Sequence, residues 1–311
     1  MSSRHWTLLI FLASLWGASY LFIKIGLEDL NPAAVVFLRT ALAAAVLLPF
    51  AAYTNALGGL RGNARTIAVL AAVQVAGPFM LISAGEKDIS SSLAGILVAS
   101  APIFTALLAI KLDDAERVHG WNLVGVGIGI LGVGLLLGLD TGGGSGALVG
   151  GIFVVVASLG YAIGGFILKK RLTGVPPVGM SGLAMAFSAA MTLPFVLIDP
   201  PEAMPGAGSL AAVAALGVFG TGVAFGLFYT MISQVGPTKA SLVAYIAPGF
   251  AVIYGVLLRD ERFTLATAGG LLLIVGGSYL AAQGAPWQSN TAPVRQPAPT
   301  PATPAAERTA A

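Results

Sequence analysis

A long apolar stretch of this chain occurs twice, with the copies about 145 residues apart. The first copy covers residues 92–138 and the second covers residues 239–284. Each copy has an apolar segment with an Ala-Pro pair (Pro102 and Pro248), a charged turn ending in Glu-Arg, and a glycine-rich apolar segment. Duplication of this kind is typical of membrane proteins built from internal repeats. The chain is therefore expected to fold as two structurally equivalent halves.

The composition places both halves in a membrane. Of the 311 residues, 57% are hydrophobic and only 9% are charged, whereas soluble domains carry roughly 25% charged residues. Apolar runs of about 20 residues are long enough to cross the hydrocarbon core as helices, and these runs lack the alternation of barrel strands. Ten such spans are predicted, at residues 7–25, 32–52, 66–85, 92–110, 120–139, 147–168, 178–198, 209–231, 240–258 and 264–282.

Five spans in each half is an odd number, so the second half must enter the membrane upside down relative to the first. We therefore expect an all-α membrane protein of two inverted five-helix repeats around a central cavity, the architecture of many secondary transporters. The predicted units are a first repeat at 1–139, a Gly-rich linker at 140–146, a second repeat at 147–284 and a disordered cytoplasmic tail at 285–311.

The loop charges predict the orientation. Cytoplasmic loops carry an excess of Lys and Arg, and here eleven such residues fall on one side and four on the other, with Arg39 inside a span. The richer side holds Arg4, Arg61, Arg65, Lys111, Arg117, Lys169, Lys170, Arg171, Lys239, Arg295 and Arg308, and the other side holds Lys24, Lys87, Arg259 and Arg262. Both termini are predicted to be cytoplasmic in the inner membrane.

Together with the duplicated block, two further features carry a family resemblance. The first span contains Trp16-Gly17-Ala18-Ser19, and the second has Asn31-Pro32 followed by Arg39. Over residues 7–284 the chain resembles the EamA-type branch of the drug/metabolite transporter superfamily. The resemblance implies a ten-helix, inverted-repeat exporter of small metabolites, often amino acids, with a central cavity. The aromatic amino-acid exporters of that family share this frame.

No cofactor, metal or nucleic-acid partner is expected. The pattern Gly127-x-Gly129-x-x-Gly132 matches a dinucleotide fingerprint, but it lies inside an apolar span with no preceding strand. Helix packing through small residues explains it better, at pairs such as Gly125/Gly129 and Gly134/Gly138. The chain has no cysteine. Its two histidines, His5 and His119, lie at predicted membrane edges, so a metal site is not indicated.

Prolines near the middle of spans are candidate hinges or gates. Proline removes a backbone donor and clashes with the carbonyl four residues earlier, which frees a polar group where lipid offers no partner. Pro102 and Pro248 lie about ten residues into their spans, and Pro78 is a third, weaker candidate. Two interpretations stay open: an ordinary kink that shapes the fold, or a pore-lining hinge.

Charged residues within the spans are almost absent. Arg39 either reaches outward or pairs with Glu28 or Asp29, or it contacts the substrate. Lys24 is interpreted as an interfacial anchor. No span contains Asp or Glu, so a proton relay inside the membrane has no candidate. Coupling to protons or sodium is therefore not supported by the sequence, and facilitated diffusion or exchange stays open.

Neutral polar and aromatic side chains are the candidates for lining the cavity. Aromatic rings with a polar tip suit a pocket for a small zwitterion, although each could equally serve as a bond between helices. The predicted cavity residues are Trp16, Ser19, Tyr20, Gln74, Ser100, Tyr161, Tyr229 and Tyr245.

The sequence thus predicts a secondary transporter that exports small metabolites by alternating access. The first class of substrate is amino acids, including aromatic or other neutral ones. The protein is expected to be a monomer in the lipid bilayer. Other metabolites or drugs, or a passive channel, are alternatives. A membrane-embedded enzyme is a further alternative, for which the turn Asp113-Asp114-Glu116 with His119 is the only acidic cluster that could act. Its counterpart, Asp260-Glu261, falls on the opposite face, so both turns are interpreted as solvated.

Overall fold

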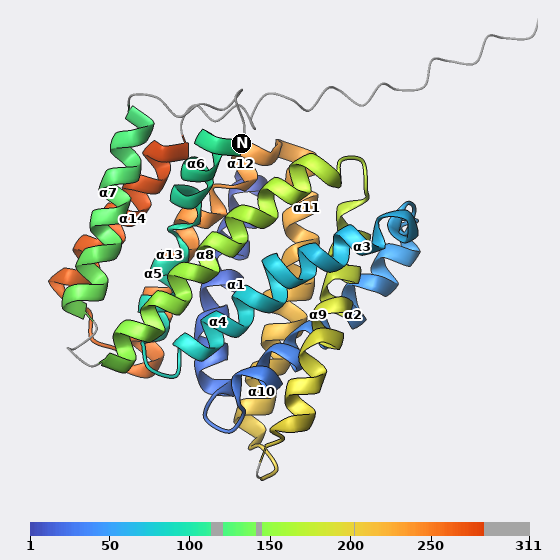
Figure 1. Ribbon diagram of the computed structural model, residues 1–311, viewed down its shortest axis with the longest axis horizontal. Coiled ribbons are helices and arrows are strands. Elements are labelled where there is room, and N and C mark those ends of the chain that lie inside the picture. Colours follow the sequence, from blue (N-terminus) through green and yellow to red (C-terminus); the bar gives the residue numbers. More distant parts are fainter. Residues whose placement is uncertain (113–120, 141–144, 202, 283–311) are drawn as a thin grey trace, which may run out of the picture.

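The computed structural model describes residues 1–112, 121–140, 145–201 and 203–282, and the regular elements of these ranges are all helical. The first repeat contains α1 (Ser3–Gly26), α2 (Pro32–Tyr53), α3 (Leu60–Leu70), η1 (Ala71–Ala76), α4 (Gly77–Gly85), α5 (Ser91–Val98), α6 (Ala101–Leu112), α7 (Trp121–Leu135) and η3 (Leu136–Asp140). The second contains α8 (Ser145–Arg171), α9 (Pro177–Ile198), α10 (Ala207–Gly217), η4 (Val218–Val223), α11 (Ala224–Val235), α12 (Pro237–Ala240), α13 (Val243–Arg259) and α14 (Leu265–Ala282). Together they form one bundle (Figure 1).

The ten predicted spans are confirmed. Within the described ranges, nine helical segments are long and apolar enough to cross a membrane. A tenth, α13, is apolar but shorter, because the chain turns at Ser241 and Leu242 before this helix begins. The predicted linker and tail fall largely on residues 141–144 and 283–311, outside the described residues.

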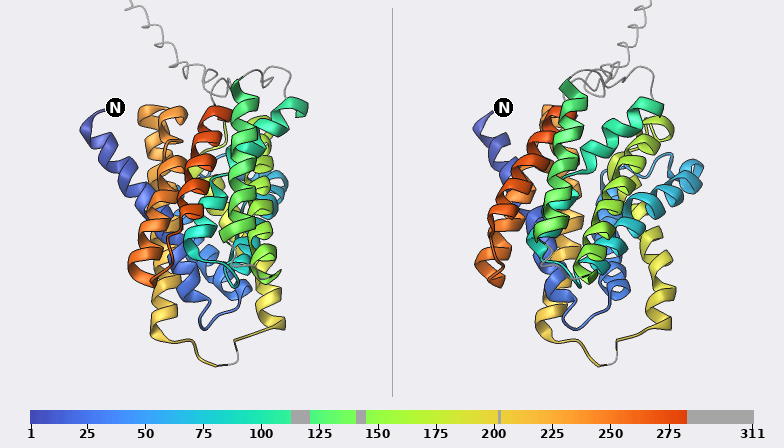
Figure 2. Two further views of the ribbon diagram at one scale, coloured as in Figure 1. Left: turned by 90° about the vertical axis from the view of Figure 1, so that its left-hand side faces the viewer. Right: turned by 60° about the vertical axis from the view of Figure 1, so that its left-hand side comes forward.

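The bundle has two ends. We call the end that carries residue 1 the N-terminal face, and the end that carries loops 27–31, 86–90, 199–206 and 260–264 the distal face (Figure 2). Helix α1 runs from the N-terminal face to the distal face, whereas α8, which opens the second repeat, runs the other way. The repeats are therefore inverted, as the odd number of spans requires.

Contacts between the repeats follow the internal symmetry. Helix α2 packs along α9, and α7 packs along α14, so equivalent spans pair with each other. Helix α1 packs against α13, while its counterpart α8 packs against α5 and α6. Most of the core consequently lies at the junction of the two halves.

The third span of each repeat contains a π-helical segment at the same place. In the first repeat an 11-residue helix, α3, leads into the six-residue π-helical segment η1, and in the second the 11-residue α10 leads into the six-residue η4. Pro78 follows η1 and cannot donate a hydrogen bond to the preceding turn, which favours a π-type bulge. In η4 the Thr221 hydroxyl donates to the carbonyl of Leu216, five residues earlier, at 2.9 Å.

Glycines hold α7 against α14 at close range. A Cβ added to Gly277 would lie 2.4 Å from the backbone nitrogen of Gly129 and 2.7 Å from the carbonyl of Gly125. Packing through Gly125 and Gly129 was predicted and is observed. The prediction for Gly134 and Gly138 was wrong, because nothing lies within 4 Å of a Cβ at either position.

Gly277→Ala should destabilise the protein by about 1–3 kcal/mol, because the added methyl group meets backbone that cannot move aside without separating the helices. The neighbouring Gly276→Ala is a matched control, since a Cβ there has no neighbour within 4 Å. Thermal unfolding of the two variants in detergent tests this expectation. Equal melting temperatures for the two variants would contradict it.

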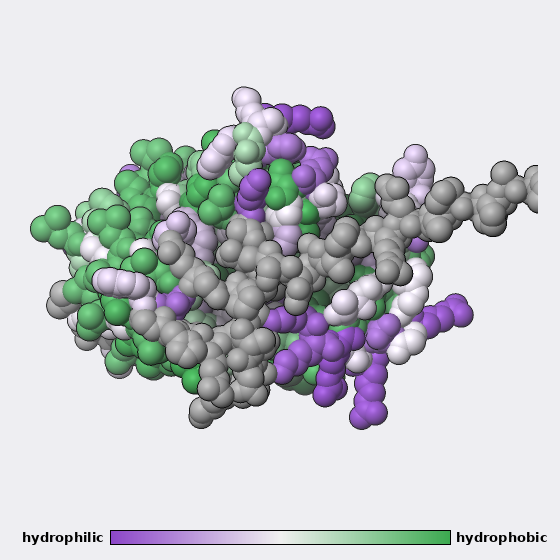
Figure 3. Space-filling model, turned by 90° about the horizontal axis from the view of Figure 1, so that it is seen from above, coloured by the Kyte–Doolittle hydropathy of each residue, from purple (hydrophilic) through white to green (hydrophobic). Residues whose placement is uncertain are grey.

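The outer surface suits a lipid environment. Large apolar side chains point away from the bundle, for example Leu131 on α7 and Leu272 on α14, which are 69% and 74% exposed. Viewed from the N-terminal face, hydrophobic side chains form the rim on the left, and hydrophilic ones gather mainly on the lower right (Figure 3). This distribution is expected of a bundle whose sides meet acyl chains and whose ends meet water.

Candidate functional site

Arg39 is the charged residue at the heart of the bundle. It lies on α2 and is 7% exposed. Its Nε–H donates to the Thr221 hydroxyl at 2.8 Å, and its guanidinium carbon lies 3.7 Å from the centre of the Phe79 ring. These contacts engage Nε and one face of the guanidinium. The two terminal nitrogens have no hydrogen-bond partner among the described residues and are not fully buried. The guanidinium therefore presents a planar pair of donors, the geometry that binds a carboxylate in bidentate fashion.

Two of the predicted cavity tyrosines accompany Arg39. Tyr20 on α1 and Tyr161 on α8 are both half-buried, and both are close enough to interact electrostatically with Arg39. The Tyr20 ring contacts α5 at Gly95, where a Cβ would lie 3.1 Å from it. Tyr161 packs against two of the core clusters that join the repeats. Arg39 and two phenols thus come together from three different spans.

The alternative for Arg39, outward reach or pairing with Glu28 or Asp29, is wrong. Glu28 instead accepts a hydrogen bond from Arg259 at 2.6 Å. Asp29 accepts from the Ser209 hydroxyl at 2.7 Å and from the Gly206 N–H at 2.9 Å. These two donors hold the pKa of the Asp29 carboxyl below its usual range. With both carboxylates engaged on the distal face, the contacts of the Arg39 guanidinium are with the Thr221 hydroxyl and the Phe79 ring.

A second group of predicted residues forms an aromatic cluster. The Trp16 ring lies 5.2 Å from Phe228 and 6.1 Å from Phe225, measured between centroids. Both phenylalanines contact Tyr229, whose hydroxyl is 2.9 Å from the Ser181 hydroxyl. The cluster joins α1, α9 and α11, so it links the repeats on the N-terminal side of Arg39.

Three other candidates occupy packing positions near the interior. The buried Ser19 hydroxyl donates to the carbonyl of Leu15 at 3.0 Å. On the third span, Gln74 and Pro78 lie against α8, where a Cβ added to Gly164 or Gly160 would collide with them.

Tyr245 does not join these residues. Its ring lies 6.0 Å from that of Tyr279, and both line an apolar hollow of about 340 Å³ with Trp6 and Ile246. This hollow lies between the beginning of α1 and the pair α13 and α14, at the periphery of the bundle. Tyr245 therefore contributes to a different surface from Tyr20 and Tyr161.

The helix that contains Pro102 is broken. Helix α5 ends at Val98 and α6 begins at Ala101, so three carbonyls near the break lose regular helical partners. Serine hydroxyls satisfy them: Ser100 donates to Leu97 at 2.7 Å, and Ser278 donates to Ala99 at 2.7 Å. Ser158 lies 3.3 Å from the Leu97 carbonyl and 3.4 Å from that of Val98.

The span that contains Pro248 is interrupted earlier, at Ser241 and Leu242, so the break does not lie beside the proline as it does in the first copy. Pro248 lies inside the single helix α13. At the repeat offset of 145 residues, Val133 is the counterpart of Ser278. Valine has no hydroxyl, so a carbonyl freed beside Pro248 would lack the donor that Ser278 provides to Ala99. One neighbouring span thus differs between the copies at a position that satisfies the break beside Pro102.

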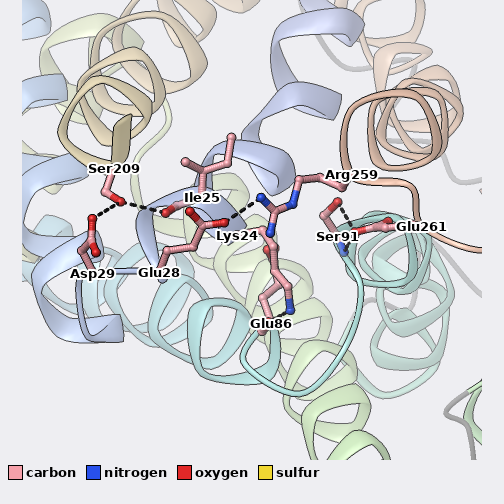
Figure 4. Close-up of polar contacts among 9 residues, drawn as sticks. All are labelled: Lys24, Ile25, Glu28, Asp29, Glu86, Ser91, Ser209, Arg259 and Glu261. Atoms are coloured by element: carbon pink, nitrogen blue, oxygen red, sulfur yellow. Dashed lines mark hydrogen bonds and ion pairs between the residues drawn. The ribbon is translucent and has the colours of Figure 1, made fainter. Parts of the chain in front are cut away.

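Glu261 joins the repeats on the distal face. Its carboxylate accepts hydrogen bonds from the backbone N–H and the hydroxyl of Ser91, both at 2.8 Å, and from the N–H of Ser92 at 2.9 Å. The Ser92 hydroxyl also donates to it (Figure 4 draws the contact with Ser91). An anion at the beginning of α5 is favoured by the unsatisfied N–H groups and the helix dipole. The interpretation of this turn as solvated was wrong for Glu261, whereas Asp260 is exposed.

Lys24 and Glu86 face inward beside that contact. The Lys24 ammonium donates to the backbone carbonyls of Glu86 and of Ile89, the latter at 2.8 Å, and so is not an interfacial anchor (Figure 4). The Glu86 side chain is 0% exposed. The expectation of an interior without a carboxyl group was therefore wrong, because Glu86 lies one residue beyond the span Leu60–Gly85 and folds back into the bundle.

Comparison with known proteins agrees with this architecture. The model of the EamA-like transporter family matches residues 4–138 and again residues 148–283. The "Uncharacterized inner membrane transporter YedA" of Escherichia coli K12 is 30% identical over 80% of this chain and 81% of its own length. The "Probable amino-acid metabolite efflux pump" of the same strain is 25% identical over 93% of this chain and 98% of its own.

A solved structure described as "Crystal structure of protein" has 20% identity and a TM-score of 0.65, and covers 93% of this chain and 100% of that one. At this identity the likeness supports the fold alone. The family model matches both halves of the chain, in agreement with the duplicated bundle and its paired repeats. The chain belongs to the EamA-like transporter family and is a membrane transporter.

Proposed function

We propose that this transporter exports small metabolites that carry a carboxylate, with amino acids as the first class, from the cytoplasm across the inner membrane. The observation that carries the proposal is the guanidinium of Arg39, which is buried between the repeats and makes a hydrogen bond only through Nε. Its two free terminal nitrogens match the two oxygens of a carboxylate. Tyr20 and Tyr161 supply rings with polar tips for the rest of a small zwitterion.

The predicted orientation puts the distal face outside and both termini in the cytoplasm. In that orientation two contacts join the repeats at the external end: the hydrogen bonds of Glu261 with the beginning of α5, and the ion pair between Arg259 and Glu28. The described conformation would then be closed to the outside. Alternating access would open this end and close the N-terminal face, so that Arg39 meets each side in turn.

The resemblance supports export of amino acids but does not identify the cargo. A relative from Escherichia coli carries the name amino-acid metabolite efflux pump, and other relatives are named only as transporters. Other carboxylate metabolites fit the same guanidinium equally well. The enzyme alternative rests on Asp113, Asp114, Glu116 and His119, which lie outside the described residues. The transporter names of the relatives favour a carrier over that alternative.

Counterflow in proteoliposomes tests the proposal. Vesicles with purified protein are loaded with one unlabelled amino acid from a panel, and uptake of the same radiolabelled amino acid is followed. A carrier gives transient, saturable accumulation, and the corresponding amino-acid amide, which lacks the carboxylate, should not compete. Absence of flux above empty vesicles for every panel member would refute the amino-acid assignment. Linear flux without counterflow would identify a passive channel instead.

A further inference from the structure

Three buried polar atoms near the end of α4 have no partner. Among the described residues, the side-chain oxygens and nitrogens that are buried without a hydrogen bond are the Ser83 hydroxyl and both carboxyl oxygens of Glu86. The two residues are three positions apart, so they share one face of the helical turn. Buried polar groups are almost always paired, so a cluster of unpaired atoms at one place calls for an explanation.

Four charged or titratable groups surround Glu86, and they come from three parts of the chain. Lys24 on α1 is near, but two of its donors are taken by the backbone carbonyls of Glu86 and Ile89. Arg39 on α2 and Tyr20 on α1 interact with Glu86 electrostatically from the interior. Glu261, beyond α13, adds a second negative charge from the distal face. None of these groups makes a hydrogen bond with the Glu86 carboxyl.

A carboxylate in this position is costly. Removing an ion from water without hydrogen-bond partners disfavours the charged form, and the group takes up a proton instead. Burial raises the pKa of Glu86 well above its usual range, although Lys24 opposes this effect. The loop 86–90 holds this residue at the distal face, a few residues from the contact between Glu261 and the beginning of α5. Closing this face and burying Glu86 thus occur at the same place.

We propose that Glu86 is a proton-binding site, and that closing the distal face takes up one proton at its carboxyl group. The proposal rests on the transport cycle proposed above and makes the closing of its distal face dependent on pH. The proton comes from water at the open distal face, binds one carboxylate oxygen and is enclosed when α5 meets Glu261. Opening the same face returns Glu86 to water, where its usual pKa favours release.

The sign of the pH dependence follows from linkage. Because the carboxyl binds its proton more tightly in the closed form, lowering the pH from above that pKa favours closing. For one proton the ratio of closed to open protein changes by up to about tenfold per pH unit. Below the usual range of a glutamic acid both forms are protonated, and the ratio stops changing.

The lack of cysteine makes the closing measurable with a single introduced thiol. Ser83→Cys is a small change at a position that is 1% exposed, and its reaction with a small water-soluble thiol reagent reports opening. Met204→Cys, on the same face but 92% exposed, gives the rate of a permanently accessible thiol at each pH. The ratio of the two rates, measured in nanodiscs without substrate, cancels the intrinsic pH dependence of the reagent.

The expected result is a rate ratio that falls as the pH is lowered from 8.5 towards 5.5. Glu86→Gln, which mimics the neutral acid, should keep the ratio low at every pH. Asp88→Asn is the matched control, because Asp88 is an exposed acid two residues away and should leave the parent's pH response unchanged. A flat ratio in the unmutated background, or an unchanged response in Glu86→Gln, would overturn the proposal.

The two cysteine variants that keep Glu86 test the proposal even if Glu86→Gln fails to fold. The labelling uses no substrate, so it is independent of the counterflow panel. If the ratio of labelling rates does not change with pH but counterflow is observed, only the proton-site proposal is refuted. If the ratio changes with pH as expected but no panel member shows counterflow, the proton-site proposal stands and the amino-acid assignment is refuted.

Discussion

Replacing Arg39 by glutamine should lower the counterflow of a carboxylate substrate by at least about thirtyfold, because losing one partner of a buried charge pair costs 2 kcal/mol or more. Arg39→Lys should also fail to restore full flux. A lysine keeps the charge but has a single nitrogen, so it loses both the paired donors and the Nε contact with Thr221. Initial rates of counterflow in proteoliposomes give the measurement.

The control for Arg39 is Thr221→Ser, which keeps the hydroxyl that accepts from Nε and should transport at close to the parent rate. Size-exclusion profiles in detergent separate loss of transport from loss of folding. If Arg39→Gln folds and carries an amino acid as fast as the parent, the carboxylate does not bind at this guanidinium. The proposed substrate class would then have no site in the described interior.

Replacing Glu261 by glutamine should open the distal face. The substitution puts an NH₂ group among N–H and O–H donors, so charge-assisted hydrogen bonds to Ser91 and Ser92 are lost. A net loss of about 3 kcal/mol, the worth of one or two such bonds, would shift the population towards the open form by roughly a hundredfold. The labelling rate of Ser83→Cys at neutral pH should rise accordingly.

The neighbouring Asp260→Asn is the control for Glu261. Asp260 is exposed and has a φ of 52°, a left-handed conformation that asparagine also tolerates. This variant should leave the labelling rate unchanged. Equal rates in Glu261→Gln and Asp260→Asn would mean that the contact with α5 does not hold the distal face closed.

The architecture was predictable because it depends on features that sequence carries directly. Length and hydrophobicity determine how many spans form, and an odd number in each half determines that the repeats are inverted. The closely packed glycines of α7 were also recognisable, although the sequence could not show which face of the helix meets α14. Gly134 lies close to Gly132 in the chain but points away from α14.

The polar contacts were not predictable, since they join residues that are distant in the chain. Glu261 and Ser91 are 170 positions apart, and only the packing of α13 against α5 brings them together. Glu86 was missed because it follows the last apolar residue of a span, where an acidic side chain usually meets water. The run Ser90-Ser91-Ser92, at the beginning of a helix, was the one available signal of a site for an anion.

The serines around Ala99 have a consequence for how such a carrier can move. A symmetric pair of repeats suggests that inward and outward opening are the same motion performed by opposite halves. Here the span of Pro102 is interrupted directly before its Ala-Pro pair, where Ser100, Ser158 and Ser278 bind the free carbonyls, whereas the span of Pro248 is interrupted earlier, at Ser241 and Leu242, and Pro248 lies inside the continuous helix α13. The two interruptions therefore lie at different distances from their Ala-Pro pairs, so inward and outward opening cannot be mirror images of each other.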